Sequence, residues 1–463
     1  MDGTAGVVWI RRSLRRYDNT ALVEAARRHD EVVPVYVVDD VLLNSESTRD
    51  KRLRFWHDSL SELEDKFDAR DDERLVVRRG DPIEEIGDVC DEVEAERVYY
   101  NNNYSPYARR NEDRLGELEV ESEGFKDVVI SEKTEITTQK GDPYQVYSYY
   151  SDKWFDIEKP EPVSPEGFVT PEVESSELPS LGQIGVSDSD SDSSVFEGGR
   201  QAGTKRLEDF VDCIDTYDEE RDYPALDSTS KLSPHLKFGT VSVREAFWAA
   251  ERVREEAEGE DKDDDGARVW QEELAWRDFY FQMLWNHPET TEKAFIEKYR
   301  SIDWGCEDDD WGAFVEGETG FPFVDAGMRQ LKQTGWMHNR PRMVTASFAA
   351  KDLRADWRRL HDHLKKHLVD ADTPAMVGGI QWAYSVGTDA QPYFRVFNPW
   401  TQGEKYDPDG EYIRQWIPEL RDVDDYIHRP YESPKFDEID YPSPILNHDE
   451  ERKKTVEIFE RHG

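Results

Sequence analysis

The hydrophobic and polar positions of this chain change period partway along its length. The first part alternates helical stretches, such as RLRFWHDSLSELEDKF from Arg52, with short β-branched runs. The runs are VVWI from Val7, VVPVYVV from Val32, RLVVRRG from Arg74, RVYYN from Arg97 and DVVIS from Asp127. This alternation predicts βαβ units that form a parallel, Rossmann-like sheet. No G-x-G-x-x-G follows the first run, so we expect no dinucleotide site there.

The strand period stops between Asp156 and Gly203. The sequence there reads PEPVSPEGFVTPEV and then VSDSDSDSSVFEGG, which is typical of a long connector with a solvated acidic Ser/Asp loop. Helical periods follow in VREAFWAAERVREEAE, VWQEELAWRDFYFQML, VDAGMRQLKQTGW and RMVTASFAAKDLRADWRRLHDHLKKHL. We therefore expect an α/β domain at 1–135, a connector at 136–205 and a large all-α domain at 206–463.

The balance of acidic and basic residues indicates what kind of surface this protein has. The 463 residues include 103 acidic and 59 basic residues, a formal net charge of -44, while 12% aromatic and 37% hydrophobic residues indicate a buried core rather than disorder. Such a surface repels nucleic acid and anionic membranes unless salt screens it or a local patch reverses its sign. The basic run KDLRADWRRLHDHLKK is either such a patch, facing DNA, or a solvated helix face. We expect a protein of a high-salt cytoplasm.

Cysteine usage and hydropathy narrow the class of protein further. Cys90, Cys213 and Cys306 are scattered, and no His, Cys or Asp grouping has convincing metal spacing. No leader is evident, and no apolar run approaches the roughly 18 residues that a membrane span needs. We expect a reduced, soluble monomer with no metal.

Four segments carry candidate chemistry. STSKLSPHLKFG, from Ser228, offers hydroxyls, backbone N–H groups and a cation to phosphate oxygens, although an ordinary helix N-cap is the alternative. Glu273, Trp276, Arg277 and Tyr280 share one helix face, which is either a polar-aromatic pocket or an ion pair beside a core tryptophan. WMHNRPRM and HLVDADTPAM add hydrogen-bonding and acidic groups. No G-x-S-x-G is present, so a hydrolase is disfavoured.

Together these segments resemble the DNA photolyase and cryptochrome family, specifically the microbial class I cyclobutane pyrimidine dimer photolyases, with halophilic character. The shared motifs, in order, include WIRRSLRRYDNTAL, TSKLSPHLKFG, ELAWRDFY, TGFPFVDAGMRQLKQTGWMHNRPRM, ASFAAKDLRADWR and GGIQWAYSVGTDAQPYFRVFNPWTQGEKYDPDGEYIRQWIPEL. The resemblance implies a deoxyribodipyrimidine photolyase that repairs dimers in single- or double-stranded DNA, using light and reduced FAD, after the dimer flips out. A cryptochrome-like blue-light or redox sensor and a DNA-binding protein with a silent flavin are the alternatives.

The resemblance also assigns site residues. Those expected to hold the flavin are Tyr217, Thr229, Ser230, Lys231, Leu232, Ser233, Trp270, Arg342, Asp370, Asp372 and Met376. Those expected to contact the lesion are Glu273, Trp276, Trp382, Asn339 and Met343, with Arg221 nearby. Met343 favours the cyclobutane dimer over the other dipyrimidine photoproduct. The fixed charge of Arg342 beside Asp370 is expected to favour an anionic reduced flavin.

Two positions beside the expected flavin depart from the family pattern. Ile380 replaces the tryptophan proximal to the flavin, although Trp357 and Trp304 match the middle and outer members of the electron-transfer chain. Isoleucine has no accessible redox state, so we expect slow photoreduction unless another residue, such as Tyr384, substitutes. Met376 replaces a common asparagine and is a poor hydrogen-bonding partner.

The first domain is expected to bind an antenna chromophore. NNNYSPYARRNEDRL from Asn101 and GDPYQVYSYYSDKW from Gly141 resemble relatives that use 8-hydroxy-5-deazaflavin. Ala108 stands where a methenyltetrahydrofolate site has an acid, so the deazaflavin is favoured over the folate. Tyrosines that merely cap the sheet are the alternative.

Overall fold

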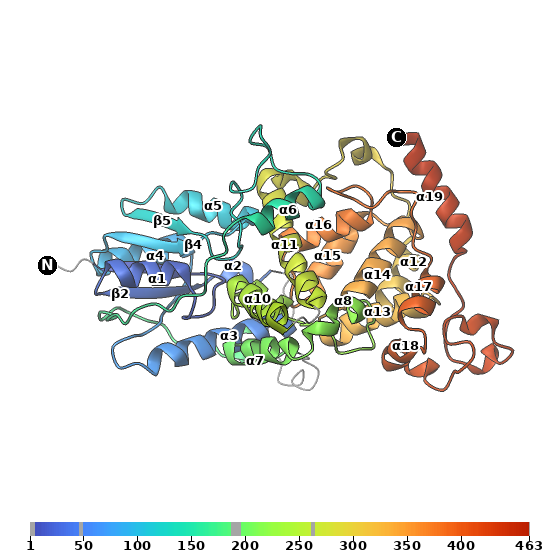
Figure 1. Ribbon diagram of the computed structural model, residues 1–463, viewed down its shortest axis with the longest axis horizontal. Helices are drawn as coiled ribbons and strands as arrows, with labels where there is room; N and C mark the ends of the chain where they lie inside the picture. Colours follow the sequence, from blue (N-terminus) through green and yellow to red (C-terminus); the bar gives the residue numbers. More distant parts are fainter. Residues whose placement is uncertain (1–4, 46–49, 187–195, 261–263, 463) are drawn as a thin grey trace. The chain divides into compact units, whose positions relative to one another are not determined.

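The computed structural model describes residues 5–45, 50–186, 196–260 and 264–462 (Figure 1). The chain divides into two compact units: Met1–Asp215 with Ser230–Asn286, and Thr216–Thr229 with His287–Gly463. Residues 187–195 of the expected acidic loop lie outside the described residues. The domain boundaries at 135 and 205 stay a prediction.

The first unit contains a five-stranded parallel sheet with strand order β3-β2-β1-β4-β5. The strands are β1 (Gly6–Ile10), β2 (Val32–Val38), β3 (Val76–Arg79), β4 (Arg97–Asn101) and β5 (Glu121–Phe125). Central β1 pairs with β2 on one side and with β4 on the other. The predicted parallel α/β fold is therefore confirmed.

Helices account for most of the remaining chain. Up to Asn286 they are α1 (Thr20–Arg28), α2 (Asp40–Leu43), α3 (Asp50–Asp68), α4 (Pro82–Glu92), α5 (Pro106–Leu115), α6 (Tyr147–Asp156), η1 (Leu181–Ile184), α7 (Arg200–Val211), η3 (Ile214–Thr216), α8 (Tyr217–Glu220), α9 (Ser233–Phe238), α10 (Val243–Glu260) and α11 (Asp265–Asn286). After Asn286 they are η4 (Pro288–Thr291), η5 (Glu297–Ser301), α12 (Asp308–Glu316), α13 (Pro322–Thr334), α14 (Asn339–Lys351), α15 (Trp357–His367), α16 (Thr373–Ala383), α17 (Pro399–Tyr406), α18 (Glu411–Trp416), η6 (Pro418–Leu420), η7 (Pro430–Glu432), η8 (Phe436–Glu438) and α19 (His448–His462). The predicted all-α character of the later part of the chain is confirmed. None of the helices in the described part of the chain is both long and apolar enough to cross a membrane.

Helices cover both faces of the sheet. Val8 of β1 packs in a buried cluster with Leu22 of α1 and Leu60 of α3. Its neighbour Trp9 belongs to a second cluster with Ile86 of α4. Because successive strand residues point to opposite faces, these two clusters are the two sides of a three-layer unit.

The fifth strand differs from the prediction. DVVIS, from Asp127, was expected to be a strand, but β5 is the polar segment ESEGF that precedes it. β5 is an edge strand, where charged side chains are tolerated because solvent lies on one side. The apolar DVVIS run is buried outside the sheet, where Val128 and Val129 pack with Tyr104 and Phe281. The backbone N–H groups of Ile130 and Ser131 both donate to Oδ2 of Asp278, on α11.

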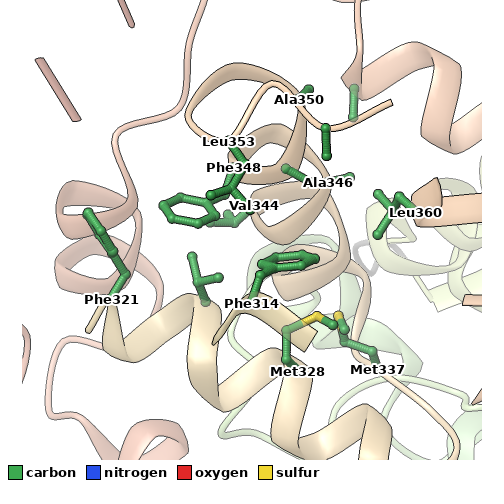
Figure 2. Packing of buried hydrophobic residues seen from close by; sticks show 14 of the residues in the cluster. Phe314, Phe321, Met328, Met337, Val344, Ala346, Phe348, Ala350, Leu353 and Leu360 are labelled. Carbon is green, nitrogen blue, oxygen red and sulfur yellow. The ribbon is translucent and has the colours of Figure 1, made fainter. Parts of the chain in front are cut away.

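The core of the second unit is a large apolar cluster built from α12 to α19. Figure 2 shows part of it, with Phe314, Phe321 and Phe348 meeting between their helices. The rings of Phe321 and Phe348 lie 4.9 Å apart, centroid to centroid. This cluster fixes the positions of α14 and α16, which carry several candidate site residues.

The continuous helical pattern predicted from Arg342 to Leu368 is interrupted. α14 ends at Lys351 and α15 begins at Trp357, with Arg354 in the left-handed region at φ 53°. The side chain of Asp356 caps α15 by accepting from the N–H of Arg358. The pattern of apolar residues carries across this break, which is why it could not be seen in the sequence.

α19 is anchored by a buried phenylalanine. Phe459 is fully buried, and its ring meets Tyr299 at 5.0 Å and stacks with Tyr393 at 5.5 Å. The ammonium group of the fully buried Lys351 lies 4.3 Å from the same ring. Thr455 also donates to the carbonyl oxygen of Lys351, at 2.6 Å.

Candidate functional site

Helix α11 carries a carboxylate and an aromatic ring one turn apart. Glu273 and Trp276 are both half-buried. Tyr147, the first residue of α6, lies face to face with the Trp276 indole, with ring centroids 3.6 Å apart and planes 9° apart. Tyr280 meets the same indole at 5.5 Å. The result is an aromatic wall beside a carboxylate.

The predicted four-residue face of α11 is only partly realised. Arg277 donates to the carbonyl oxygen of Val128, and its guanidinium lies 4.3 Å from the ring of Phe281. Arg277 therefore supports the DVVIS segment, and it does not belong to the wall formed by Trp276 and Tyr280.

A buried carboxylate fixes α6 against α11. Oδ2 of Asp278 accepts a hydrogen bond from Nε1 of Trp154 at 2.9 Å, in addition to the two backbone bonds from the DVVIS segment. Burial raises the pKa of Asp278 to about 6, and the Arg277 charge opposes that rise. Asp278 thus holds together three segments of the first unit behind the Glu273 and Trp276 face.

Trp270, one of the expected flavin neighbours, is a core residue of the first unit. It is buried, meets Phe210 at 4.9 Å in an edge-to-face contact, and its Nε1 donates to the carbonyl oxygen of Ala246 at 3.4 Å. Its role beside a flavin stays a prediction.

The hydroxyl-rich segment does not behave as an ordinary N-cap. The N-cap of α9 is Leu232, with no side-chain cap, and its N–H donates to Oγ of Ser230 at 3.3 Å. Lys231 adopts a left-handed conformation with φ 49°, which is uncommon for a residue with a side chain. Ser233 is the first residue of α9. The N-cap alternative is therefore not supported.

Two hydroxyls of the second unit lack the partners that buried polar groups normally have. Oγ of Ser228 and Oγ1 of Thr229 are buried and make no hydrogen bond to any described residue. Tyr217, at the start of α8, is also buried, with Arg221 5.5 Å from its ring. Because most buried polar groups are satisfied, these hydroxyls fit a ligand that carries phosphate or hydroxyl oxygens, as FAD does.

A charge pair links α14 to the segment before α16. Nη2 of Arg342 donates to Oδ2 of the buried Asp370 at 2.7 Å, and Nε donates to the carbonyl oxygen of Met337 at 2.7 Å. Asp372 is the N-cap residue of α16. The structure thus brings together the expected pair Arg342 and Asp370.

The expected lesion residues of the second unit lie on α14 and α16. Trp382 is half-buried, and its neighbour Gln381 is held by the backbone of η4 through a hydrogen bond to Thr290 at 2.9 Å. Asn339 is exposed and lies 3.8 Å from the sulfur of Met343, measured from Nδ2. These residues sit on rigid helices rather than on loops.

The two departures from the family pattern are buried in the core of the second unit. Met376 and Ile380 are 8% and 4% exposed, and they share an apolar cluster with Trp357. Tyr384, one turn beyond Ile380, is fully buried and meets the half-buried Trp304 edge to face at 5.5 Å. An aromatic side chain therefore stands next to the expected outer tryptophan.

The basic run KDLRADWRRLHDHLKK is largely occupied by internal pairs. Arg354 pairs with Glu451, Arg358 with Asp356 and Arg359 with Asp308. Lys351 is fully buried. These four cations are therefore engaged within the protein, which weakens the interpretation of this run as a DNA-facing patch.

The carboxyl end of β1 offers a further candidate site. Nη2 of Arg11 donates to Glu112 at 2.6 Å, whereas Nε and Nη1 are buried without a hydrogen bond to the described residues. The guanidinium lies 4.6 Å from the Trp9 ring. Ala108 is buried, and as an alanine it carries no carboxylate.

Sequence reasoning missed Tyr147 as a site residue. It fell within a segment interpreted as an antenna loop, but most of that segment is helix α6. The spacing of Tyr147, Tyr150 and Trp154 at i, i+3 and i+7 is the signal that could have placed one aromatic face toward another helix.

Two family models match this chain. One described as DNA photolyase matches residues 6–166, and one described as the FAD binding domain of DNA photolyase matches residues 270–461. A deoxyribodipyrimidine photo-lyase of Halobacterium salinarum is 39% identical over 98% of this chain and 98% of that protein. The crystal structure of a class III photolyase from Agrobacterium tumefaciens gives a TM-score of 0.91 at 30% identity, covering 100% of this chain and 98% of that one. The Synechocystis cryptochrome gives a TM-score of 0.88 at 25% identity, covering 99% of this chain and 100% of that one.

Proposed function

This chain belongs to the DNA photolyase family, and we propose that its substrate is the cyclobutane pyrimidine dimer of ultraviolet-damaged DNA, in single or double strands. It is a flavin-dependent lyase that repairs DNA with light. The observation that best supports the substrate is the pairing of Glu273 with the stacked Trp276 on one face of α11.

When bound, FAD absorbs light and supplies the electron that splits the dimer. The hydroxyls of Ser228 and Thr229 bind its polar oxygens, because they are buried and otherwise unpartnered in the described structure. Lys231 adds a positive charge to this segment. Tyr217, Ser230, Leu232, Ser233, Trp270, Asp372 and Met376 complete the flavin contacts carried over from the family resemblance.

Arg342 and Asp370 control the charge at the flavin. Arginine carries a fixed positive charge, so Arg342 favours an anionic group nearby. Its hydrogen bond to Asp370 at 2.7 Å and a second bond to a backbone carbonyl hold the guanidinium in one orientation. This arrangement supports binding of the reduced, negatively charged form.

The lesion pocket combines hydrogen bonding with stacking. Glu273 accepts hydrogen bonds from the N–H groups of the dimer, while Trp276 and Trp382 pack against its bases. The family resemblance also assigns Asn339 and Met343 to contacts with the lesion. A flipped-out dimer reaches such a pocket more easily than an intact pair does, because a damaged step costs less to unstack.

Electrons reach the oxidised flavin by a modified route. Trp304 and Trp357 are the outer and middle residues, and Ile380 interrupts the path near the flavin. We propose Tyr384, one turn after Ile380 on the chain, as a substitute electron carrier; its 5.5 Å contact with Trp304 places it beside the outer member of the route. Cellular reductants that act directly on the flavin would be sufficient for repair if this route is slow.

The antenna is 8-hydroxy-5-deazaflavin, bound at the carboxyl end of the sheet. The buried nitrogens of Arg11 that make no hydrogen bond to the described residues support a polar ligand there. Val41 and Leu42, which are 69% and 52% exposed after β2, supply apolar surface. Ala108 argues against a folate, because no carboxylate is present at that position.

The net charge of -44 supports a monomeric protein of a high-salt cytoplasm. Salt screens the repulsion between this surface and DNA phosphates, while it also reduces the binding gained from counterion release. Recognition of the dimer then depends mainly on stacking and shape.

The decisive experiment measures repair of a thymine dimer in a single-stranded oligonucleotide under blue light in concentrated KCl. The flavin is reduced chemically beforehand, so that the interrupted electron route cannot limit the result. Recovery of pyrimidine absorbance that is lost in Glu273→Ala supports the proposed substrate and site. Absence of repair with confirmed reduced flavin contradicts the proposal and favours a light or redox sensor.

A further inference from the structure

Tyr147 makes a face-to-face contact with a proposed lesion residue. Its ring lies 3.6 Å from that of Trp276, centroid to centroid, with an interplanar angle of 9°. An indole has two faces, and a stack at this distance covers one of them. Only the other face of Trp276 can then receive a base.

The hydroxyl of Tyr147 adds a hydrogen bond to this stack. It donates a hydrogen bond to the carbonyl oxygen of Glu272 at 2.8 Å, and Glu272 directly precedes Glu273. Burial, followed by the charges of Glu273 and Glu272, raises the pKa of Tyr147, so the hydroxyl remains a donor. The same side chain therefore contacts the indole and the backbone beside the carboxylate.

The helix that carries Tyr147 is held along its length. Tyr150 lies 5.4 Å from the Phe279 ring, and Trp154 donates to Asp278 at 2.9 Å. Both Phe279 and Asp278 belong to α11, and both are fully buried. The support behind Trp276 is therefore part of a packed helix pair rather than a mobile loop.

We propose that Tyr147 is a positioning residue that holds Trp276 so that the flipped-out dimer stacks on the indole face that Tyr147 does not cover. The inference rests on the proposed role of Trp276 in the lesion pocket. A partly exposed tryptophan without such a support samples several rotamers, and ordering it on binding costs affinity. Tyr147 orders Trp276 before DNA binds, so binding of the dimer no longer carries this cost. We therefore expect Tyr147 to strengthen binding of DNA that contains a dimer and to leave the affinity for undamaged DNA unchanged.

The test compares three variants of the FAD-loaded protein. Tyr147→Leu removes the aromatic stack, Tyr147→Phe keeps the ring and removes the hydroxyl, and Tyr149→Leu alters a residue that is 63% exposed on the same helix. Dark binding is measured to single-stranded oligonucleotides with and without one thymine dimer. Flavin content and Tm are recorded for every variant. If Tyr147→Leu does not yield folded holoenzyme, Tyr147→Met takes its place.

We expect Tyr147→Leu to bind the dimer about 3- to 10-fold more weakly, the size expected from losing one aromatic stack, with unchanged affinity for undamaged DNA. Tyr147→Phe and Tyr149→Leu should stay within about 2-fold of the wild type. Repair per absorbed photon, measured at saturating protein, should be unchanged in Tyr147→Leu.

Two results overturn the inference. One is wild-type discrimination in Tyr147→Leu. The other is an equal fall in both affinities together with loss of flavin, which means that Tyr147 only stabilises the fold. A wild-type protein that itself fails to prefer the dimer contradicts the proposed function instead, so the two failures are distinguishable.

Discussion

The guanidinium of Arg342 and the carboxylate of Asp370 are joined by a 2.7 Å hydrogen bond, and the carboxylate is almost completely removed from solvent. This bond ties α14 to the segment that leads into α16. Two helices that carry proposed flavin and lesion residues are thereby held at a fixed distance. Because the proposed flavin contacts and the proposed lesion contacts both depend on this bond, a mutation that breaks it should weaken both.

Replacing Arg342 by alanine leaves the buried carboxylate of Asp370 without this cation. We expect a loss of stability on the order of 2 kcal/mol, less than for a fully buried pair because Arg342 is 27% exposed, together with loss of bound FAD. Thermal unfolding and flavin absorbance of the purified protein measure both effects. Arg342→Lys keeps the charge and should retain more flavin. Full flavin occupancy in Arg342→Ala contradicts the assignment.

Glu273→Gln tests the proposed hydrogen bond to the dimer. The substitution preserves volume and removes the charge, so we expect dimer binding to weaken by about 10-fold, a size typical of losing one charge-assisted hydrogen bond. FAD content should not change. Dark binding and repair yield are the measurements. Glu272→Gln, at the neighbouring position on α11, serves as the matched control and should behave as the wild type.

One substitution on the proposed electron route should increase a rate, whereas the variants above should lose function. Ile380→Trp should accelerate photoreduction of oxidised FAD, at a cost of about 1 to 3 kcal/mol because the site is already packed. Tyr384→Phe in the wild-type background should abolish the remaining slow photoreduction, since phenylalanine is much harder to oxidise. Both rates are followed by flavin absorbance under blue light, with Ile380→Leu as the packing control. Photoreduction that survives Tyr384→Phe unchanged would remove Tyr384 from the route.

The buried side chain of Lys351 should make the stability of this protein depend on pH in an unusual way. Its burial lowers the pKa to about 7, whereas an unfolded lysine titrates near about 10.4. Between these values the unfolded chain binds more protons than the folded protein, so this group makes stability rise as pH increases. Below about pH 7 both states are protonated, and the unfavourable contribution of the buried charge is then constant.

The measurement is the free energy of unfolding of the wild type and Lys351→Met between about pH 7 and pH 9. We expect the wild type to gain about 1 kcal/mol per pH unit relative to the variant. Because the variant lacks the donor to Ser385 Oγ at 2.7 Å, the slopes are compared rather than the absolute stabilities. Parallel slopes would show that Lys351 titrates normally.

The sequence predicted the parallel sheet, the later helical part and several long amphipathic helices, such as α3, α10 and α11, because these follow from local periodicity. It misplaced the fifth strand. Apolar content marked Val128 and its neighbours as a strand, but the backbone N–H groups there bond to Asp278, a partner about 150 residues away along the chain, and not to a neighbouring strand. A long-range contact of this kind leaves no local pattern. The break at Arg354 was hidden for a related reason, since apolar spacing continued through it.

Some residues of the candidate site were predicted from the sequence, and others were missed or misplaced. The pair of Arg342 and Asp370 was found because family resemblance named both residues. Tyr147 was missed because its role arises only when α6 packs on α11, and tyrosines in a polar segment equally fit a loop. Arg277 was placed on the wall by helical spacing alone, whereas the carbonyl of Val128 draws it away. Spacing gives the side of a helix but not the direction of a long side chain.

The buried ring of Phe459 makes α19 a part of the core that a shortened protein cannot lose without damage. The ring is enclosed by Tyr299, Tyr393 and the aliphatic and charged parts of Lys351, so deleting α19 would open an aromatic cavity next to Trp304. Water entering there would hydrate Lys351 and shorten the life of any oxidised aromatic ring. Shortened variants of this protein should therefore keep α19 intact.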